Sequence, residues 1–277
     1  MTARPGMSAM LKAVAAAVNL VAAEEIMPHH MKAVDELLKD DGSLCTEVDL
    51  AAQESLTRKL QAILNVPVLG EEMSTDRQLE IWGDGLQTVW CIDPLDGTSN
   101  FVRGLPYFSV SVALFRAGKC ALGVVYAPVT NEMFAAEYQR GAFLNGARLP
   151  ERIVAGSLKD ALAGVDMKRL DGRLAGSLAS HPPYISQRNF GASTLDWCYT
   201  AAGRYDVYLH GGQKLWDYAA GCLVLLEAGG QVCSLEEDNF DAANVWRRSV
   251  VASLDAKLFD EWKNCLRARL SVPLLNI

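Results

Sequence analysis

The sequence predicts an α+β fold in which helices flank an antiparallel sheet. In the amino-terminal segment, from Met7 to about Leu38, apolar residues recur at three- and four-residue steps, as in an amphipathic helix. Short runs rich in β-branched and aromatic residues follow between Thr88 and Glu137. The segment Trp216 to Ala228 is mostly apolar, which is typical of a buried helix.

The amino-terminal pattern predicts a first helix that Pro28 bends or ends. The polar residues from Lys39 to Leu44 have the composition of a tight turn or a mobile loop. The segment Asp49 to Leu64 predicts a second helix, and the apolar run from Val66 to Leu69 predicts a short strand.

The central runs predict an antiparallel meander, because Gly118 and the residues from Pro128 to Asn131 separate them. Asn145-Gly146 is a strong signal for a two-residue hairpin turn. Regular signals weaken after Arg152, although a helix over Leu195 to Arg204 and a strand over Asp206 to Leu209 are predicted. Gly229-Gly230 is expected to end the apolar helix.

The composition limits the partners and the cellular compartment that can be expected. The net charge of −7 argues against a nucleic-acid partner, because such proteins usually present clustered Lys and Arg. The seven cysteines are scattered without a CxxC pair, so we expect reduced, mostly buried thiols. No run reaches the ~20 apolar residues of a membrane span, and no signal-peptide cleavage pattern follows the apolar segment Ala13 to Ala23. We therefore expect a cytoplasmic protein without a membrane partner.

The most informative stretch runs from Trp90 to Phe101, WCIDPLDGTSNF. It begins as a hydrophobic strand and ends in small polar residues, so Asp93 and Asp96 emerge near the end of a strand. Pro94 and Gly97 allow backbone shapes in which the two carboxylates converge. Converging hard oxygen ligands favour Mg²⁺, Mn²⁺ or Ca²⁺. A helix that starts at Gly97-Thr98 would also bind an anion at its amino end.

Each acidic element has a simpler alternative. The sequence DPxDG alone is often a plain turn, and Gly70-Glu71-Glu72 after a strand is often a solvated turn. Asp217, at the start of the apolar helix, is a common N-capping residue. The case for a metal site depends on the three elements occurring together.

Together these elements resemble the inositol monophosphatase family of lithium-sensitive, Mg²⁺-dependent phosphatases. The resemblance is carried by GEE at 70–72, WxxDPxDGTxNF at 90–101 and WDxAAGxxLxxEAGG at 216–230, and it extends from about Gly42 to Val251. It implies a layered αβαβα sandwich with an amino-terminal lobe, residues 1–150, that carries most metal ligands. A carboxy-terminal lobe, residues 151–277, would complete the site.

The resemblance also implies the residues of the site. Glu71, Asp93 and the carbonyl of Leu95 would hold one Mg²⁺, and Asp93, Asp96 and Asp217 a second. A third, weaker ion would lie near Glu71, Mn²⁺ could substitute, and Li⁺ would inhibit. Asp49 and Thr98 would orient the attacking water, while Glu72 would support the ligands and Trp90 would pack in the core. Backbone N–H groups at Gly97 and Thr98 would bind phosphate oxygens.

Substrate contacts are less determined. Asp96, Gly97, Thr98, Ser193, His210 and Asp217 are the candidates for substrate binding. In inositol-preferring members an acid occupies the position of His210, so the preference for inositol 1-phosphate is open. A lone His is more often structural, and Arg103 is more simply a solvated loop residue. Histidinol phosphate, fructose 1,6-bisphosphate and 3′-phosphoadenosine 5′-phosphate are alternative substrates.

We therefore predict a phosphoric monoester hydrolase that acts on a small polyol or sugar phosphate. The alternative from another class is a non-catalytic regulatory protein of the same fold. A degenerate member would be expected to lack a ligand, and none of the expected ligands is missing. Family resemblance further implies a homodimer, and the loop Lys39 to Leu44 is a candidate lid.

Overall fold

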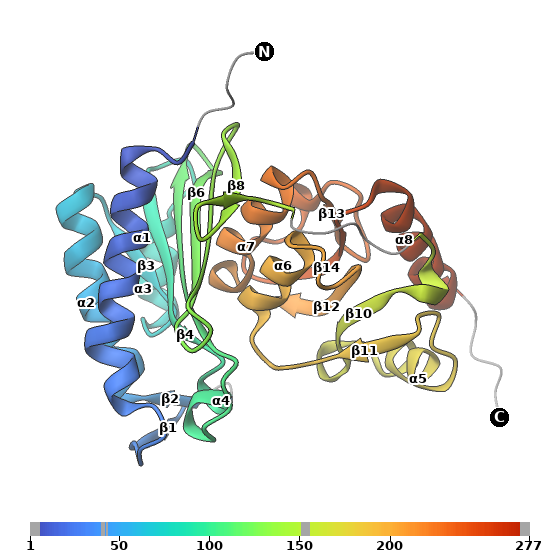
Figure 1. Cartoon of the computed structure of the whole chain (residues 1–277), viewed down its shortest axis with the longest axis horizontal. Helices are drawn as coiled ribbons and strands as arrows, with labels where there is room; N and C mark the ends of the chain where they lie inside the picture. The colour runs from blue at the N-terminus through green and yellow to red at the C-terminus, as the bar shows by residue number, and fades with distance from the viewer. Residues whose placement is uncertain (1–5, 40–41, 43, 151–155, 272–277) are drawn as a thin grey trace.

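The computed structural model describes residues 6–39, 42, 44–150 and 156–271, which form alternating layers of helix and sheet (Figure 1). Two helices cover the outer face of a seven-stranded sheet, and two more separate it from a five-stranded sheet. The remaining long helices lie against the far face of the second sheet. This order confirms the predicted αβαβα sandwich.

The first helix ends near Pro28. Helix α1 (Ala9–Val21) continues into a π-helical turn, Ala22–Ile26, and then a 3₁₀ turn, Met27–His29, that contains Pro28. Pro28 therefore ends the first helix, one of the two outcomes predicted for it, because a proline removes a backbone donor and disfavours helical geometry before it. The helical pattern does not continue to Leu38. The chain instead forms strand β1 (Glu36–Leu38), which pairs with β2 (Leu44–Thr46).

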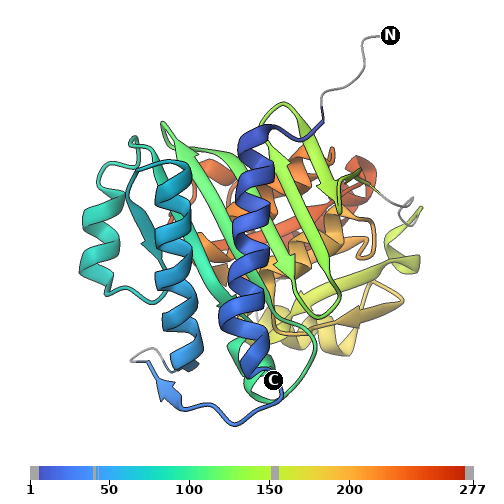
Figure 2. The same ribbon diagram turned by 60° about the vertical axis from the view of Figure 1, so that its left-hand side comes forward.

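Helix α2 (Glu47–Ile63) confirms the second predicted helix and begins two residues earlier than expected. Thr46 caps it in a reciprocal pair with Asp49, which satisfies backbone donors that a helix start leaves unpaired. In Figure 2, α1 and α2 lie along the same face of the large sheet. Their apolar faces, including Val14, Val18 and Leu56, are fully buried against it.

The large sheet has the order β3-β4-β5-β6-β7-β8-β9 and is antiparallel except where β3 pairs with β4. It confirms the predicted meander. Asn145 and Gly146 both have positive φ, as a two-residue hairpin turn requires. Its strands are β3 (Val68–Gly70), β4 (Val89–Asp96), β5 (Ser109–Arg116), β6 (Lys119–Ala127), β7 (Glu132–Glu137), β8 (Gly141–Leu144) and β9 (Ala147–Arg148), with helices α3 (Thr75–Trp82) and α4 (Thr98–Val102) in its connections.

Helices α6 (Ser193–Ala201) and α7 (Leu215–Glu227) form the middle layer, and both were predicted. Helix α7 approaches the large sheet so closely that a Cβ on Gly123 would lie 2.9 Å from the backbone of Ala220. A glycine is therefore required on β6 at this crossing. Gly229, with φ of 98°, ends α7 as expected.

The second sheet has the order β11-β10-β12-β14-β13, and its first three strands are parallel. Only β12 of these strands was predicted. The outer helix α8 was missed, although Leu258, Phe259, Trp262 and Leu266 are buried at helical spacing. The elements are β10 (Leu162–Asp166), α5 (Gly172–Ser180), β11 (Ser186–Arg188), β12 (Val207–Gln213), β13 (Gln231–Cys233), β14 (Arg248–Ser253) and α8 (Ala256–Ser271).

The two sheets share one core. The cluster that contains α6 and α7 draws buried residues from both sheets, including Phe134 and Tyr208. The first sheet uses residues 68–148 and the second 162–253, but the division into lobes at residue 150 stays a prediction. Among the described helices, none combines the length and the apolar character needed to cross a membrane.

Candidate active site

Strand β4 delivers the first two carboxylates. Asp93 and Asp96 are three residues apart, so a regular strand would point them to opposite faces. The pairing with β5 shifts here, because Asp93 lies opposite Ser111 and Asp96 opposite Ser109. One extra residue on β4 therefore forms a bulge, the device by which strands redirect side chains. Pro94 and Leu95 lie in this bulge, and the Leu95 N–H donates to Asp93 Oδ1 at 3.1 Å.

A sharp turn follows these acids. Gly97 has φ of 88°, and a Cβ there would lie 3.0 Å from the carbonyl oxygen of Tyr107. Glycine is thus required by both conformation and space. The turn leads into the short helix α4, confirming the predicted helix start at Thr98.

Thr98 contacts the acid expected to orient water. Its hydroxyl lies 3.0 Å from Asp49 Oδ1 and 3.0 Å from the carbonyl oxygen of Leu95. The other oxygen of Asp49 accepts hydrogen bonds from the Thr46 N–H and hydroxyl at 2.7 and 2.5 Å. Burial raises the pKa of Asp49, although these hydrogen bonds oppose the shift. Residues 49 apart in the sequence are therefore brought together as predicted.

The GEE segment lies beside β4, at the end of β3. The Glu71 N–H donates to the Ile92 carbonyl at 3.2 Å, which fixes Glu71 next to the strand that carries Asp93. Lys39 was not predicted to contact this segment, yet its ammonium lies 2.9 Å from Glu71 Oε1 and 2.7 Å from Glu72 Oε1. Burial opposes protonation of Lys39, but the charges of Glu71 and Glu72 raise its pKa above the ordinary value. Lys39 therefore supplies positive charge to this acidic segment.

Helix α7 contributes the fourth acid. Asp217 Oδ2 accepts a hydrogen bond from the Lys214 N–H at 2.9 Å, so Asp217 does stabilise the helix start. The same helix end lies on β5, where the Ser111 hydroxyl is 3.5 Å from the carbonyl of Trp216. Since Ser111 pairs with Asp93, capping and participation in the acidic site are compatible roles for Asp217.

The four acids influence one another electrostatically. Burial, together with the charges of Glu71, Asp96 and Asp217, raises the pKa of Asp93 well above its ordinary value. Burial raises the pKa of Asp96 to about 6, against hydrogen bonds from Thr194. Burial and then the charges of Glu71 and Asp96 raise the pKa of Asp217 to about 8. Like charges held together in this way require protons or cations to neutralise them.

The donor set fits a hard divalent cation, because it consists of carboxylate oxygens and one available backbone carbonyl. Within the described residues, however, no three acidic, His or Cys side chains already stand around a common point at ligand distance. Asp93 is buried, whereas Glu71, Asp96 and Asp217 keep exposed surface. These residues are close enough to repel one another, but their side chains would have to move before they could share an ion.

The start of α6 borders Asp96. The Thr194 N–H and hydroxyl each lie 2.7 Å from Asp96 Oδ2, and the neighbouring Ser193 is half-buried. Asn100 holds the preceding segment by donating to the carbonyls of Tyr107 and Phe190 at 2.7 and 2.6 Å. The contacts of Thr194 and Asn100 were not predicted from the sequence. Asn100 lies within the WCIDPLDGTSNF motif, so the sequence held a stronger signal for a role of Asn100 than for one of Thr194.

Three further residues named from the sequence differ in their exposure to solvent. Trp90 is fully buried and donates to the Leu64 carbonyl at 3.1 Å, which confirms its packing role. Arg103 is exposed at the end of α4. His210 is buried on β12, and its Nε2 lies 3.4 Å from Asp166 Oδ2. The predicted lid falls partly on residues 40, 41 and 43, which lie outside the described residues.

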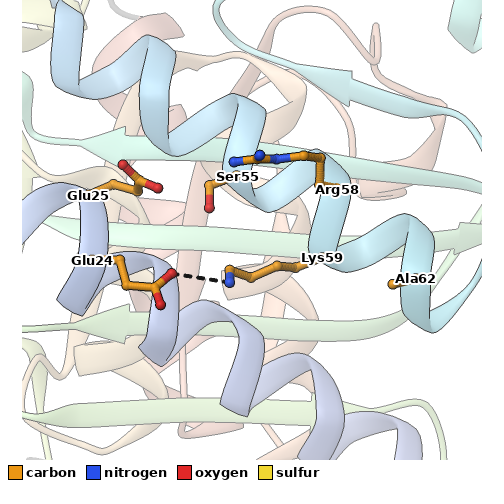
Figure 3. A pocket seen from close by; sticks show the side chains of 6 residues that line it. All are labelled: Glu24, Glu25, Ser55, Arg58, Lys59 and Ala62. Atoms are coloured by element: carbon orange, nitrogen blue, oxygen red, sulfur yellow. Dashed lines mark ion pairs between the residues drawn. The ribbon is translucent and has the colours of Figure 1, made fainter.

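A separate surface hollow of about 360 Å³ lies between the π-helical turn and α2 (Figure 3). Glu24 and Lys59 form an ion pair of 3.1 Å across it. Its α2 residues begin at Ser55, about 9 Å along the helix from Asp49 at 1.5 Å per residue. This hollow is therefore distinct from the acidic site.

A family model described as the inositol monophosphatase family matches residues 6–269. The chain belongs to this family. It is 41% identical over 204 residues to Nus factor SuhB of Pseudomonas aeruginosa, covering 70% of this chain and 73% of that protein. It is 36% identical over 217 residues to the inositol-1-monophosphatase of Mesorhizobium japonicum, covering 75% and 79%. The motif-based resemblance is thus confirmed.

Solved structures agree with the fold of the inositol monophosphatase family. The extragenic suppressor protein suhB of Bartonella henselae has a TM-score of 0.80 at 28% identity, with 96% of this chain and 100% of that chain covered. More distant structures of the same fold include an IMPase/NADP phosphatase complexed with Mg²⁺ and phosphate and a LiCl-soaked staphylococcal inositol monophosphatase-1. Those two are 22% and 23% identical to this chain, with TM-scores of 0.76 and 0.75. Each similarity covers 92% of this chain. It covers 91% of the IMPase/NADP phosphatase chain and 90% of the staphylococcal chain.

Proposed function

We propose that this protein is a Mg²⁺-dependent phosphatase of small phosphate monoesters. The observation that carries the proposal is the gathering of Glu71, Asp93, Asp96 and Asp217 beside a hydrogen-bonded Asp49–Thr98 pair. We call these residues the phosphate end of the site. Raised pKa values such as those of Asp93, Asp96 and Asp217 are typical of a functional site.

Two groups of residues would hold the ions. Glu71, Asp93 and the carbonyl of Leu95 would ligate one Mg²⁺, and Asp93, Asp96 and Asp217 a second. A third ion near Glu71 is part of the same proposal, as are substitution by Mn²⁺ and inhibition by Li⁺. Bound Mg²⁺ would neutralise phosphate oxygens, lower the pKa of the attacking water and stabilise the departing oxygen.

The chain's own groups would position the reactants. Thr98 donates to Asp49, so its oxygen can accept a hydrogen bond from the attacking water. The N–H groups at Gly97 and Thr98 begin α4 and are suited to bind phosphate oxygens without reorganisation. The water oxygen would bond to phosphorus while the ester P–O bond breaks, giving inorganic phosphate and an alcohol. This route needs no covalent phosphoenzyme.

The test is a phosphate-release screen of the purified protein in Mg²⁺, in EDTA, and in Mg²⁺ with Li⁺. Inositol 1-phosphate, histidinol phosphate, fructose 1,6-bisphosphate and 3′-phosphoadenosine 5′-phosphate are the substrates. We expect release that requires Mg²⁺, falls with Li⁺ and favours one substrate. Absence of release from all four, despite Mg²⁺ binding measured by calorimetry, would overturn the proposal.

A second candidate is a non-catalytic regulatory role for the same fold. This role is favoured by the 41% identity to a relative that is named Nus factor SuhB and is not named for a phosphatase activity. The screen separates the two candidates, because a purely regulatory protein would bind Mg²⁺ without releasing phosphate.

The proposal includes a homodimer in the cytoplasm that has no nucleic-acid or membrane partner. A reducing compartment agrees with the seven cysteines, all of which are free thiols in the structure and five of which are buried. The net charge of −7 disfavours nucleic acid. Sedimentation equilibrium checks the dimer, and a monomer at micromolar concentration would contradict it.

A further inference from the structure

His210 and Asp166 form a buried pair next to the start of α6. The two residues are register partners on the parallel strands β12 and β10, at the carboxyl end of β10. His210 is 6% exposed, whereas the side chain of its partner Asp166 is 18% exposed. The ends of adjacent parallel strands are common places for ligand-binding side chains.

The hydrogen bonds of His210 determine its role. The Gly212 N–H donates to Nδ1 at 3.1 Å, so this nitrogen carries a lone pair and the ring proton is on Nε2. Nε2 faces Asp166 Oδ2 at 3.4 Å. Both ring nitrogens therefore contact the protein, and His210 presents no nitrogen to a ligand.

Asp166, in contrast, is a carboxylate that is held in place by hydrogen bonds and still has free acceptor positions. Its Oδ1 accepts from the Lys168 N–H at 3.0 Å and from Asn189 Nδ2 at 3.3 Å. Burial would raise the pKa of Asp166, but hydrogen bonds from the His210 side chain and from the Lys168 N–H hold it below the ordinary value. A carboxylate offers about four acceptor positions, so an oxygen on the exposed side can accept from a ligand.

The segment 189–194 joins this pair to the phosphate end. Asn189 contacts Asp166 at one end of the segment, and Thr194 contacts Asp96 at the other. The charges of Asp96 and Asp166 both add to the burial that raises the pKa of Asp196, so the two carboxylates lie near the same buried group. Ser193, half-buried, lies on this segment between them.

We propose that Asp166 contacts the substrate by accepting hydrogen bonds from hydroxyl groups of its alcohol portion, and that His210 is a positioning residue for Asp166. This inference rests on the proposed phosphatase function. We call Asp166, His210 and Ser193 the alcohol end of the site. An anionic acceptor selects neutral hydroxylated alcohols and disfavours a second phosphate by repulsion. The substrate class is therefore a polyol monophosphate, in preference to fructose 1,6-bisphosphate or 3′-phosphoadenosine 5′-phosphate.

Asp166→Asn tests the contact directly. The measured quantity is kcat/KM for inositol 1-phosphate divided by kcat/KM for p-nitrophenyl phosphate, whose leaving group has no further hydroxyl. We expect the ratio to fall about tenfold or more, mainly through KM, the effect of losing a hydrogen bond to a charged group. The matched control is Asp171→Asn, which removes the same charge at an exposed N-cap where Asn is also favourable. A ratio that changes equally in both variants would overturn the proposal.

The positioning role has its own variants. His210→Phe keeps a ring of similar size but removes the Nε2 donor, and the same ratio should fall about threefold or more. His210→Gln, which can supply a side-chain N–H, should restore part of the ratio. If both variants lower only the thermal midpoint and leave the ratio at the wild-type value, His210 has a purely structural role and the assignment is wrong.

Binding measurements keep this inference separate from the phosphatase proposal. Calorimetry with Ca²⁺ in place of Mg²⁺ gives the affinity of wild type and Asp166→Asn for inositol 1-phosphate and for phenyl phosphate. A tenfold loss specific to the polyol supports the contact even if no hydrolysis is found. Equal affinities of the two proteins for both ligands would overturn it even if wild type is an active phosphatase.

Discussion

The phosphate end and the alcohol end are built in different ways. At the phosphate end, four acids that repel one another are fixed by a strand bulge, a glycine turn and the start of α7, and Asp49 is held beside them at the start of α2. At the alcohol end, one carboxylate is held by hydrogen bonds from His210, Lys168 and Asn189. The first arrangement requires protons or cations to neutralise it, and the second does not.

This difference predicts what kind of effect a substitution at each end will have. Residues of the phosphate end are constrained by one another, because removing any of them unbalances the charge of the rest. Asp166 is held instead by the Lys168 N–H, by the buried His210 on β12 and by the exposed Asn189, none of which is a carboxylate. Substitutions at the two ends should therefore differ in kind: loss of turnover at the first, and a change of substrate ratio at the second.

The largest effect is expected for Asp93→Asn. Asp93 is buried and is the shared ligand in the proposed site, so kcat should fall by about 10³-fold, the upper range for one preorganised electrostatic group. Without metal the variant should be at least as stable as wild type, because a repelling carboxylate is removed. Phosphate release and thermal melting in EDTA provide the measurements. Asp76→Asn, an exposed change in α3, is the control; near-normal turnover of Asp93→Asn would contradict the shared-ligand assignment.

Thr98→Val should have the next largest effect. The variant keeps the shape of the side chain but loses the hydroxyl that lies 3.0 Å from Asp49, so kcat should fall about 100-fold. Thr98→Ser keeps the hydroxyl and should retain most of the activity. Near-normal turnover of Thr98→Val would contradict a role for the Thr98 hydroxyl and its contact with Asp49.

The metal-free protein should lose stability as the pH rises. Burial raises the pKa values of Asp96 and Asp217 to about 6 and about 8, above their unfolded values. The folded state then binds more protons than the unfolded state, and the associated stability is lost as the pH rises through these values. We expect the melting temperature in EDTA to fall by about 5 °C between about pH 5 and pH 9. Saturating Mg²⁺ should reduce this slope, and an equal slope with and without Mg²⁺ would separate these acids from the metal site.

Sequence patterns predicted the phosphate end better than the alcohol end, for a physical reason. Asp93, Asp96, Gly97 and Thr98 belong to one turn, so local constraints place them together in the sequence. Asp166 and His210 meet only through strand pairing between residues 44 apart, and neither lies in a recognisable motif. Likewise, the contact of Asp49 with Thr98 was predicted from family resemblance and not from residue spacing.

The fold followed the same rule. The meander and α7 have strong periodicity or continuous apolar character, and both were predicted. Strands β10 and β11 are short and lie in a parallel sheet whose pairing partners are distant in sequence. Pro28 ended the first helix, as one of the two predicted outcomes, but strand β1 at Glu36–Leu38 was not predicted. Lys39 was assigned only to a loop because nothing local connects it to Glu71.

Lys39→Met should produce the smallest effect and tests whether Lys39 competes with metal at the phosphate end. Its ammonium contacts Glu71 and Glu72, and Glu71 is a proposed Mg²⁺ ligand. Removing it should lower the Mg²⁺ concentration for half-maximal activity by about threefold, the size expected for a partly screened ion pair. The control is Lys59→Met, which breaks the Glu24 pair in the hollow of Figure 3. A higher Mg²⁺ requirement in Lys39→Met alone would mean that Lys39 helps to assemble the ligands instead of competing for them.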